Sequence, residues 1–432
     1  MRTTLQAIAS KSTREKDYKF RNLYRLLNEE NLLYAWTLLN KNSASGVDKV
    51  TAREYGQNLR ENIRDLTERL KRHSYRAKLV KRVYIPKGKD KLRPLGLPSL
   101  EDKLVQIVVA QILSAIYEAD FLPSSFGYRP KCGPQDAVLD ITDTLYGNRH
   151  NYVVEADIKG FFDNIDHDWL IKMLEERISD AQFIRLIRKW LKAGILETDG
   201  RVIHPVTGTP QGGIVSPVLA NIFLHYALDL WFDRVVKKHC EGKTYIIRYA
   251  DDFVCSFQYK RDAEKFYRAL PKRLAKFKLT VAPEKTRIVP FSRYKPDGVS
   301  CFDFLGFEYR WVLNKKGEPV IRRRTSRKKF RASIAHFKQW CREHRNERLD
   351  KFFSVVNSKL RGYHNYYGIK GNSVSISRFQ HAAERLMYKW LNRRSQRRSF
   401  NWTQFRVTLD RYLTVRPIVH DPRRSQLRLS FT

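Results

Sequence analysis

Residues 244–257 read T-Y-I-I-R-Y-A-D-D-F-V-C-S-F and set two acidic residues, Asp251 and Asp252, between two apolar runs. Both runs are rich in β-branched and aromatic residues, which predicts a β-hairpin with the acidic pair at its tip. Adjacent carboxylates repel each other unless a cation lies between them. Mg²⁺ is the expected cation because it is a hard ion that prefers oxygen ligands. An acidic turn without metal is the alternative, since Asp is common in turns.

The composition indicates a polyanionic partner. The 432 residues include 83 Lys and Arg against 45 Asp and Glu, a formal net charge of +38, with 12% aromatic residues. Such a balance is typical of proteins that follow a nucleic acid, although a merely basic protein or one that binds anionic membranes would share it. Apolar runs fall short of the ~20 residues of a membrane span. The first 20 residues lack the apolar core of a signal peptide, and five scattered cysteines predict neither a disulfide framework nor structural zinc. We therefore expect a cytoplasmic protein.

Two segments carry residues suited to binding a triphosphate. The run from Leu79 to Leu97 predicts a hairpin whose arms carry Lys87 and Arg93. Lys can act there as a point charge and Arg as a bidentate fork, but an ordinary basic surface hairpin would look the same. Residues 209–217, T-P-Q-G-G-I-V-S-P, predict a turn that opens a helix. Glycines in that turn would let a ligand approach the backbone, with Gln211 placed to bond a sugar or base.

A third carboxylate lies far from the hairpin in sequence. Residues 152–157 predict a strand that ends at Asp157, 94 residues before Asp251. An acid at the end of a core strand is usually paired or metal-bound, and two-metal chemistry needs carboxylates from separate elements. The next helix is predicted over 169–191, with Glu175, Glu176 and Arg177 as solvated charges.

The C-terminal part is predicted to contact nucleic acid. Residues 311–432 hold 30 Lys and Arg against 7 Asp and Glu, so +23 of the +38 lies there. Two basic runs, 322–329 and 393–398, alternate with helices rich in Trp and Tyr, a pattern that favours phosphate contact over a plain solvated face. Earlier in the chain, the loop 126–130 sets an aromatic ring beside Arg129, which suits stacking on a base or gripping a backbone.

The order of these motifs resembles the successive sequence blocks of a reverse transcriptase. The series is I-P-K…R-P-L-G-L-P, S-F-G-Y-R-P, D-I-K-G-F-F, T-P-Q-G-G-I-V-S-P, Y-A-D-D, E-K-T and F-L-G-F. The closest resemblance is to group II intron-encoded reverse transcriptase/maturase proteins. N-S-A-S-G-V-D (42–48) resembles an additional upstream block of non-retroviral members, and R-G-Y-H-N-Y-Y (361–367) resembles the R-G-W-x-N-Y-F motif of the maturase domain. The resemblance covers residues 20 to 420.

The resemblance implies an α+β right-hand polymerase, with fingers, a palm built on an antiparallel sheet, and a helical thumb. It implies that Asp157, Asp251 and Asp252 are catalytic and, with Ile158, bind two Mg²⁺ ions. The incoming deoxynucleoside triphosphate would be held by Lys87, Arg93 and Gln211. Phe162 would exclude a ribose 2′-hydroxyl by steric clash, and Lys285 would protonate the pyrophosphate, although Ala282 stands where Asn is expected.

The resemblance also implies a division of the chain and its partners. Residues 1–80 would form an N-terminal extension with the upstream finger block, 81–310 the fingers and palm, and 311–390 the helical thumb or maturase domain. Residues 391–432 would be either a small DNA-binding segment or the end of the thumb, and we expect no endonuclease domain. The expected partners are an RNA template, a DNA primer, group II intron RNA and target DNA, but no membrane. The implied RNA contacts are Arg129, Arg361, Tyr363, Arg393 and Arg394.

Three other functions share parts of this evidence. A splicing factor with an idle polymerase would keep the basic surface, but the unbroken Y-A-D-D argues against it. A domesticated relative in phage defence or CRISPR adaptation would use the same chemistry on another template. An RNA-directed RNA polymerase is opposed by the bulky ring of Phe162.

Overall fold

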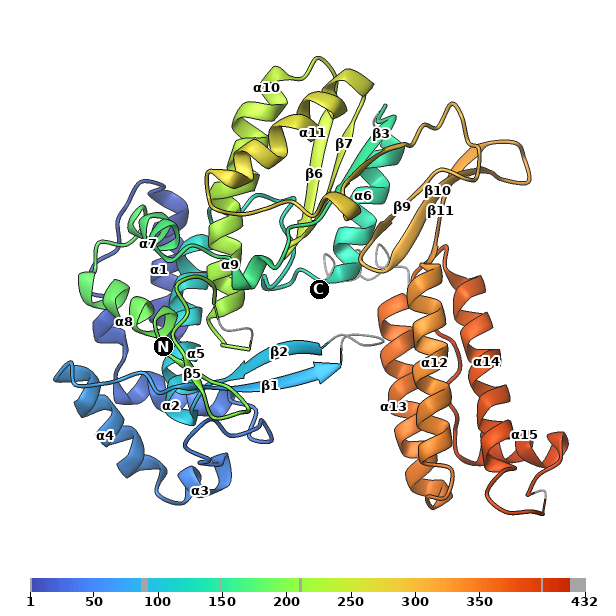
Figure 1. Cartoon of the computed structure of the whole chain (residues 1–432), viewed down its shortest axis with the longest axis horizontal. Coiled ribbons are helices and arrows are strands. Elements are labelled where there is room, and N and C mark those ends of the chain that lie inside the picture. The colour runs from blue at the N-terminus through green and yellow to red at the C-terminus, as the bar shows by residue number, and fades with distance from the viewer. Residues whose placement is uncertain (1, 87–91, 148, 210–211, 398, 420–432) are drawn as a thin grey trace.

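The computed structural model describes residues 2–86, 92–147, 149–209, 212–397 and 399–419. Its central element is an antiparallel sheet with the strand order β6-β7-β3-β8 (Figure 1). The predicted hairpin at 244–257 is confirmed, because β6 and β7 pair from Thr244 opposite Phe257 to Tyr249 opposite Asp252. β3 runs antiparallel to β7 and places Ala156 opposite Phe253. The strands are β3 (Tyr152–Ala156), β6 (Thr244–Tyr249), β7 (Asp252–Phe257) and β8 (Arg287–Pro290).

Both faces of this sheet are covered, so its strands are apolar on both sides. Cys255 and Phe257 face a core shared with α9 (Ser216–Leu224) and α11 (Lys260–Ala275). Val254 faces a separate core with α6 (Pro134–Gly147). Alternate residues of a strand point to opposite faces, which explains the split. After α9 the chain continues through two π-helical turns, η3 (His225–Asp229) and η4 (Phe232–Val236), and then α10 (Lys237–His239).

The predicted hairpin at 79–97 is also confirmed. β1 pairs antiparallel with β2, and β1 is extended by β4 and β5 into the order β2-β1-β4-β5. Helices of the N-terminal half pack behind this sheet and share a core with the helical face of the central sheet (Figure 1). The elements are α1 (Arg2–Arg14), η1 (Tyr24–Leu26), α2 (Glu29–Leu38), α3 (Ala52–Gln57), α4 (Leu59–Lys71), β1 (Val80–Pro86), β2 (Leu92–Leu97), α5 (Leu100–Tyr117), η2 (Phe161–Asp163), α7 (His167–Glu175), α8 (Ala181–Leu191), β4 (Ile195–Leu196) and β5 (Val202–Ile203).

The helix predicted over 169–191 is wrong in one respect. It is divided into α7 and α8 by a break in which Asp180 caps the start of α8. Glu175 and Glu176 are exposed as predicted, but Arg177 is buried and pairs with Asp120 at 2.9 Å. The break turns the Arg177 side chain inward, where its ion pair compensates the cost of burial.

The C-terminal part begins with strands. η5 (Pro283–Lys285) precedes β8, and a sheet of order β11-β10-β9 then crosses the predicted boundary at residue 310. The following helices build a core of their own, which includes Phe405 of α15 (Figure 1). Residues 402–411 are thus continuous with the helical region, while the predicted domain boundaries and DNA-binding role stay predictions. The elements are β9 (Cys301–Phe304), β10 (Phe307–Leu313), β11 (Pro319–Thr325), α12 (Arg327–Glu343), α13 (Leu349–Tyr367), α14 (Ser373–Leu391) and α15 (Trp402–Arg411). Within the described ranges, every helix is too short or too polar to cross a membrane.

Candidate active site

The antiparallel register brings the predicted catalytic aspartates to one edge of the central sheet. Asp252 is the first residue of β7, and Asp157 directly follows β3, whose last residue lies opposite Phe253. The chain reverses through Ala250, which has φ +57°, a left-handed conformation that is uncommon for a residue other than glycine. Such conformations persist where surrounding contacts enforce them, and they are frequent at functional sites.

The site carries more negative charge than the protein compensates. The pKa of Asp252 is raised to about 7 by the protein surrounding its carboxyl group and then by Asp251, with smaller contributions from Asp157 and Glu155. A backbone hydrogen bond from Leu305 opposes that rise. The ammonium group of Lys285 forms an ion pair with Asp157, which raises the pKa of Lys285. A divalent cation among these carboxylates would stabilise their ionised forms.

The donor set fits a hard cation only in part. Carboxylate oxygens are the ligands that Mg²⁺ prefers, and Mg²⁺ usually keeps several waters and binds substrate phosphates as well. Across the part of the chain that the structure describes, His, Cys, Asp and Glu side chains nowhere gather in a group of three or more that could hold a metal by itself. The aspartates therefore suit an ion whose remaining ligands come from water and nucleotide.

A buried arginine supports the aspartate turn from below. Arg248 is 1% exposed, and its guanidinium pairs with Asp229 while donating to Asn221, Ser125 and the carbonyl of Ala250. The Arg248 Nη1–Ala250 carbonyl distance is 2.9 Å. Asp229 ends the π-helical turn η3, and such bulges often occur at functional sites. The sequence gave no signal for Arg248 beyond a charged residue inside an apolar strand, which is itself unusual.

The loop 124–128 lies alongside the same turn. Its backbone pairs with Arg248 in both directions, through Arg248 N to Ser124 O at 2.9 Å and Phe126 N to Arg248 O at 2.8 Å. A Cβ on Gly127 would lie 2.2 Å from the backbone nitrogen of Ala250, so only glycine fits. Tyr128 follows with φ +57° and 51% exposure. Burial raises the pKa of Tyr128 and Asp251 adds to the rise, which places this ring beside the aspartates.

Residues predicted to hold the nucleotide lie around this edge. Phe162 follows Gly160, whose φ is +56°, and its ring packs edge-on against Phe161. Phe162 is 7% exposed. Arg93 lies on β2 opposite Ile85, and its residue surface is exposed. Lys87 and Gln211 lie outside the described residues. Ile158 is buried and bridges Val281.

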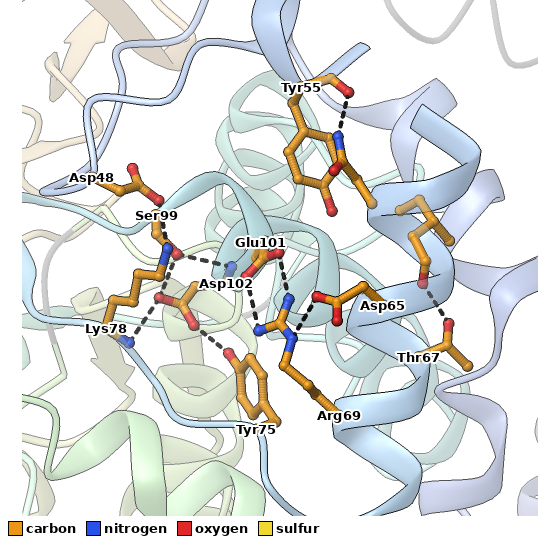
Figure 2. A network of polar contacts seen from close by, with 12 residues as sticks. Asp48, Tyr55, Asp65, Thr67, Arg69, Tyr75, Lys78, Ser99, Glu101 and Asp102 are labelled. Carbon is orange, nitrogen blue, oxygen red and sulfur yellow. Dashed lines mark hydrogen bonds and ion pairs between the residues drawn. The ribbon is translucent and has the colours of Figure 1, made fainter. Parts of the chain in front are cut away.

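Polar residues at the start of α5 connect the basic hairpin with its neighbours (Figure 2). Asp102 accepts hydrogen bonds from Tyr75, Ser99 and the backbone of Lys78, just before β1. Lys78 in turn pairs with Asp48 of the loop 42–48 at 3.1 Å. Nearby, Arg69 binds Glu101 at 2.6 Å and Asp65 at 2.8 Å.

One turn further along α5, Gln106 accepts a hydrogen bond from Ile214 N at 2.9 Å. A Cβ on Gly212 would lie 2.4 Å from the carbonyl oxygen of Gly96 on β2. The helix therefore fixes both the basic hairpin and the end of the 209–217 segment. Sequence analysis expected α5 to be a buried helix and missed this role. The available signal was the presence of Asp102, Lys103 and Gln106 in an otherwise apolar helix.

The predicted RNA contacts fall in different environments. Arg361 is exposed on α13, whereas Tyr363 is buried with its ring centre 3.6 Å from that of Phe379. Arg129 is occupied by Glu118 at 2.8 Å and by carbonyl groups of its own loop. Arg393 lies over the Trp390 ring at 5.5 Å, and Arg394 donates to the Glu347 carbonyl at 3.2 Å. Their contacts with RNA stay predictions.

An antiparallel sheet that presents aspartates from a strand end and a hairpin turn, beside a basic hairpin, is an arrangement suited to nucleotidyl transfer. Residues 85–309 match the family described as reverse transcriptase (RNA-dependent DNA polymerase). The chain belongs to this family, and more narrowly to its group II intron-encoded branch. The predicted fold class and the predicted activity, RNA-directed DNA polymerase, are thereby confirmed. Reverse transcriptases generally use divalent metal ions.

Similar proteins come from intron-encoded genes of several organisms. The group II intron-encoded protein LtrA of Lactococcus lactis subsp. cremoris is 30% identical over 88% of this chain and 76% of its own length. Protein YkfC of Escherichia coli is 34% identical over 48% of this chain and 62% of its own length. A 91 kDa protein in the cob intron of Schizosaccharomyces pombe is 37% identical over 52% of this chain and 28% of its own length.

Proposed function

We propose that the polymerase reaction takes place at Asp157, Asp251 and Asp252, which with Ile158 would hold two Mg²⁺ ions. The observation that carries the proposal is the convergence of these carboxylates at one sheet edge, with the pKa of Asp252 raised to about 7. When bound, the ions would activate the primer 3′-hydroxyl and stabilise the leaving pyrophosphate. The chain itself contributes the fixed turn at Ala250 and the charge that selects cations.

The nucleotide would be bound between the sheet edge and the basic hairpin. Arg93 suits bidentate contact with a phosphate, and Lys87 and Gln211 are proposed on sequence grounds. Lys285 reaches Asp157 in the absence of nucleotide. A metal ion bound to Asp157 would compete with that ion pair, and the freed ammonium group could then donate a proton to pyrophosphate.

We expect the Phe162→Ala variant to incorporate ribonucleotides more readily. The buried ring limits the space beside the sugar, and its removal would lift the proposed clash with a 2′-hydroxyl. The measurement is the ratio of kcat/KM for dNTP and rNTP in primer extension on RNA. We expect that ratio to fall by at least about tenfold, a change of roughly 1.4 kcal/mol. Phe161→Leu, next to it in the core, is the matched control. An unchanged ratio in Phe162→Ala would remove the gate assignment.

We further propose that the protein binds group II intron RNA and assists its splicing, with an RNA template, a DNA primer and target DNA as other partners. Support comes from the intron-encoded relatives and from the charge of +23 on residues 311–432. Arg361, Arg393 and Arg394 are the proposed contacts of the helical region, with Tyr363 and Arg129 as supporting residues. RNA-dependent splicing assays with and without the protein test this role.

Affinity for intron RNA should fall steeply as salt rises. Each phosphate neutralised contributes a slope of about −0.7 to −0.9 in log K against log salt concentration. Titrations of labelled RNA at several salt concentrations measure that slope. Arg361→Gln should reduce the slope by about 0.7 to 0.9 if this exposed side chain contacts a phosphate, whereas exposed Arg201→Gln, outside the helical region, should leave it unchanged. A nearly flat salt response in the wild type would contradict the basic surface as the RNA-binding face.

A further inference from the structure

The turn between β9 and β10 lies between the helical region and the catalytic aspartates. Phe304 is opposite Phe307, so Leu305 and Gly306 form a two-residue connection. Both have left-handed conformations, with φ +51° and +77°. The tight hairpin turn with two such residues favours Asn-Gly or Gly-Gly, so a leucine in the first position is unusual. A conformation of this kind persists when neighbouring groups enforce it.

The end of α13 supplies those neighbours. Tyr366 donates a hydrogen bond from its hydroxyl to the Leu305 carbonyl at 3.0 Å, and its ring stacks on Phe307 with an interplanar angle of 13°. A Cβ on Gly306 would lie 3.0 Å from the Tyr367 hydroxyl. The start of α12 contributes as well, because Ser326 N donates to the Gly306 carbonyl at 2.8 Å. The turn is therefore held from the helical side at both of its residues.

The other side of the same turn reaches the aspartates. The backbone N–H of Leu305 donates to the carboxylate of Asp252. One peptide unit thus separates a bond to the helical region, at the Leu305 carbonyl, from a bond to the active site, at the Leu305 N–H. Tyr366 itself lies close enough to Asp252 and Tyr249 that both add to the burial that raises its pKa.

We propose that Tyr366 is a positioning residue, which couples the placement of α13 to the position of Asp252 through Leu305. This inference rests on the proposed role of Asp252 in metal binding. The segment R-G-Y-H-N-Y-Y then acts as a joint between the helical region and the palm. The ring alone would satisfy the packing against Phe307, whereas the hydroxyl has the specific task of holding the Leu305 peptide. Displacement of α13 would turn that peptide and withdraw its N–H from Asp252.

The test compares Tyr366→Phe with Tyr412→Phe. Both lose a hydroxyl and keep a stacked ring, but Tyr412 stacks on Phe353 inside the helical region, away from the palm. Amide hydrogen exchange at Leu305 is measured first, in protein without metal or nucleotide. We expect exchange to become about 2- to 10-fold faster in Tyr366→Phe, the range set by loss of one ordinary hydrogen bond, and to stay unchanged in Tyr412→Phe.

Primer extension then gives the Mg²⁺ concentration for half-maximal rate, kcat and the KM for dNTP. We expect Tyr366→Phe to raise the Mg²⁺ requirement and lower kcat, each by about 2- to 10-fold, with the KM for dNTP and the unfolding temperature unchanged. Unchanged Leu305 exchange in Tyr366→Phe, or equal effects in Tyr412→Phe, would overturn the proposal. Faster exchange with an unaltered Mg²⁺ requirement would overturn the coupling to Asp252. Absence of extension by every variant and by the wild type would instead contradict the proposed function, and the exchange result would still decide whether Tyr366 holds Leu305.

Discussion

Asp157→Asn and Asp251→Asn are each expected to lower RNA-templated DNA synthesis on the order of 10³-fold or more. Asparagine keeps the size of the side chain but removes the negative charge that the proposed ions require. The two residues serve one metal-binding unit, so their double variant should lose little beyond either single change. Single-turnover primer extension on an RNA template measures the rate, and retained binding of the template–primer duplex shows that the variants are folded.

Asp168→Asn is the matched control. Asp168 is an exposed acid on α7 that pairs with Arg188 at 3.3 Å, and its replacement should leave the rate within about twofold, since exposed pairs contribute little. Wild-type rates in Asp157→Asn would place the reaction elsewhere. Additive losses in the double variant would mean that the two aspartates act independently.

Arg248→Met is expected to lower the free energy of unfolding by roughly 3–5 kcal/mol. The change leaves Asp229 as an uncompensated charge in a core where both side chains are at most 2% exposed. It also removes the donors to Asn221, Ser125 and the Ala250 carbonyl. Chemical unfolding followed by circular dichroism gives the change, and primer extension should fall as well because the turn at Ala250 loses its support.

Adding Asp229→Leu to Arg248→Met should recover part of the lost stability, because replacement of both charges removes the buried unpaired carboxylate. Polymerase activity should stay low in the double variant, since Ala250 is still without its hydrogen bond. Lys237→Ala breaks an exposed pair with Asp233 and should cost less than about 1 kcal/mol. A cost for Arg248→Met no larger than that for Lys237→Ala would contradict the supporting role of Arg248.

Local pattern was sufficient for the hairpins of the palm and fingers. Alternating β-branched and aromatic residues predicted β6 and β7, and the run into Ile85-Pro86 predicted β1 and β2, because strand periodicity is a short-range property. The meeting of Asp157 with the hairpin is a long-range property. It depends on the pairing of β3 with β7, so it followed from the resemblance and from the chemistry of carboxylates, and periodicity could not supply it.

Side-chain environments were harder to predict. Arg177 looked solvated because its sequence neighbours are acidic, and only the break between α7 and α8 turns it toward Asp120. Tyr363 looked like a contact for RNA because it lies in a motif, yet it packs on Phe379 in the helical core. Arg248 and Gln106 are linked to partners 19 or more positions away, and such pairing becomes visible only in the folded chain.

The most direct test is primer extension on an RNA template with dNTPs and Mg²⁺, comparing the wild type with Asp251→Ala/Asp252→Ala. DNA synthesis by the wild type alone is the predicted result, and it would assign the chemistry to the turn after Tyr249. Equal synthesis by both proteins, or none by the wild type while it still binds the template–primer duplex, would contradict the assignment of the active site.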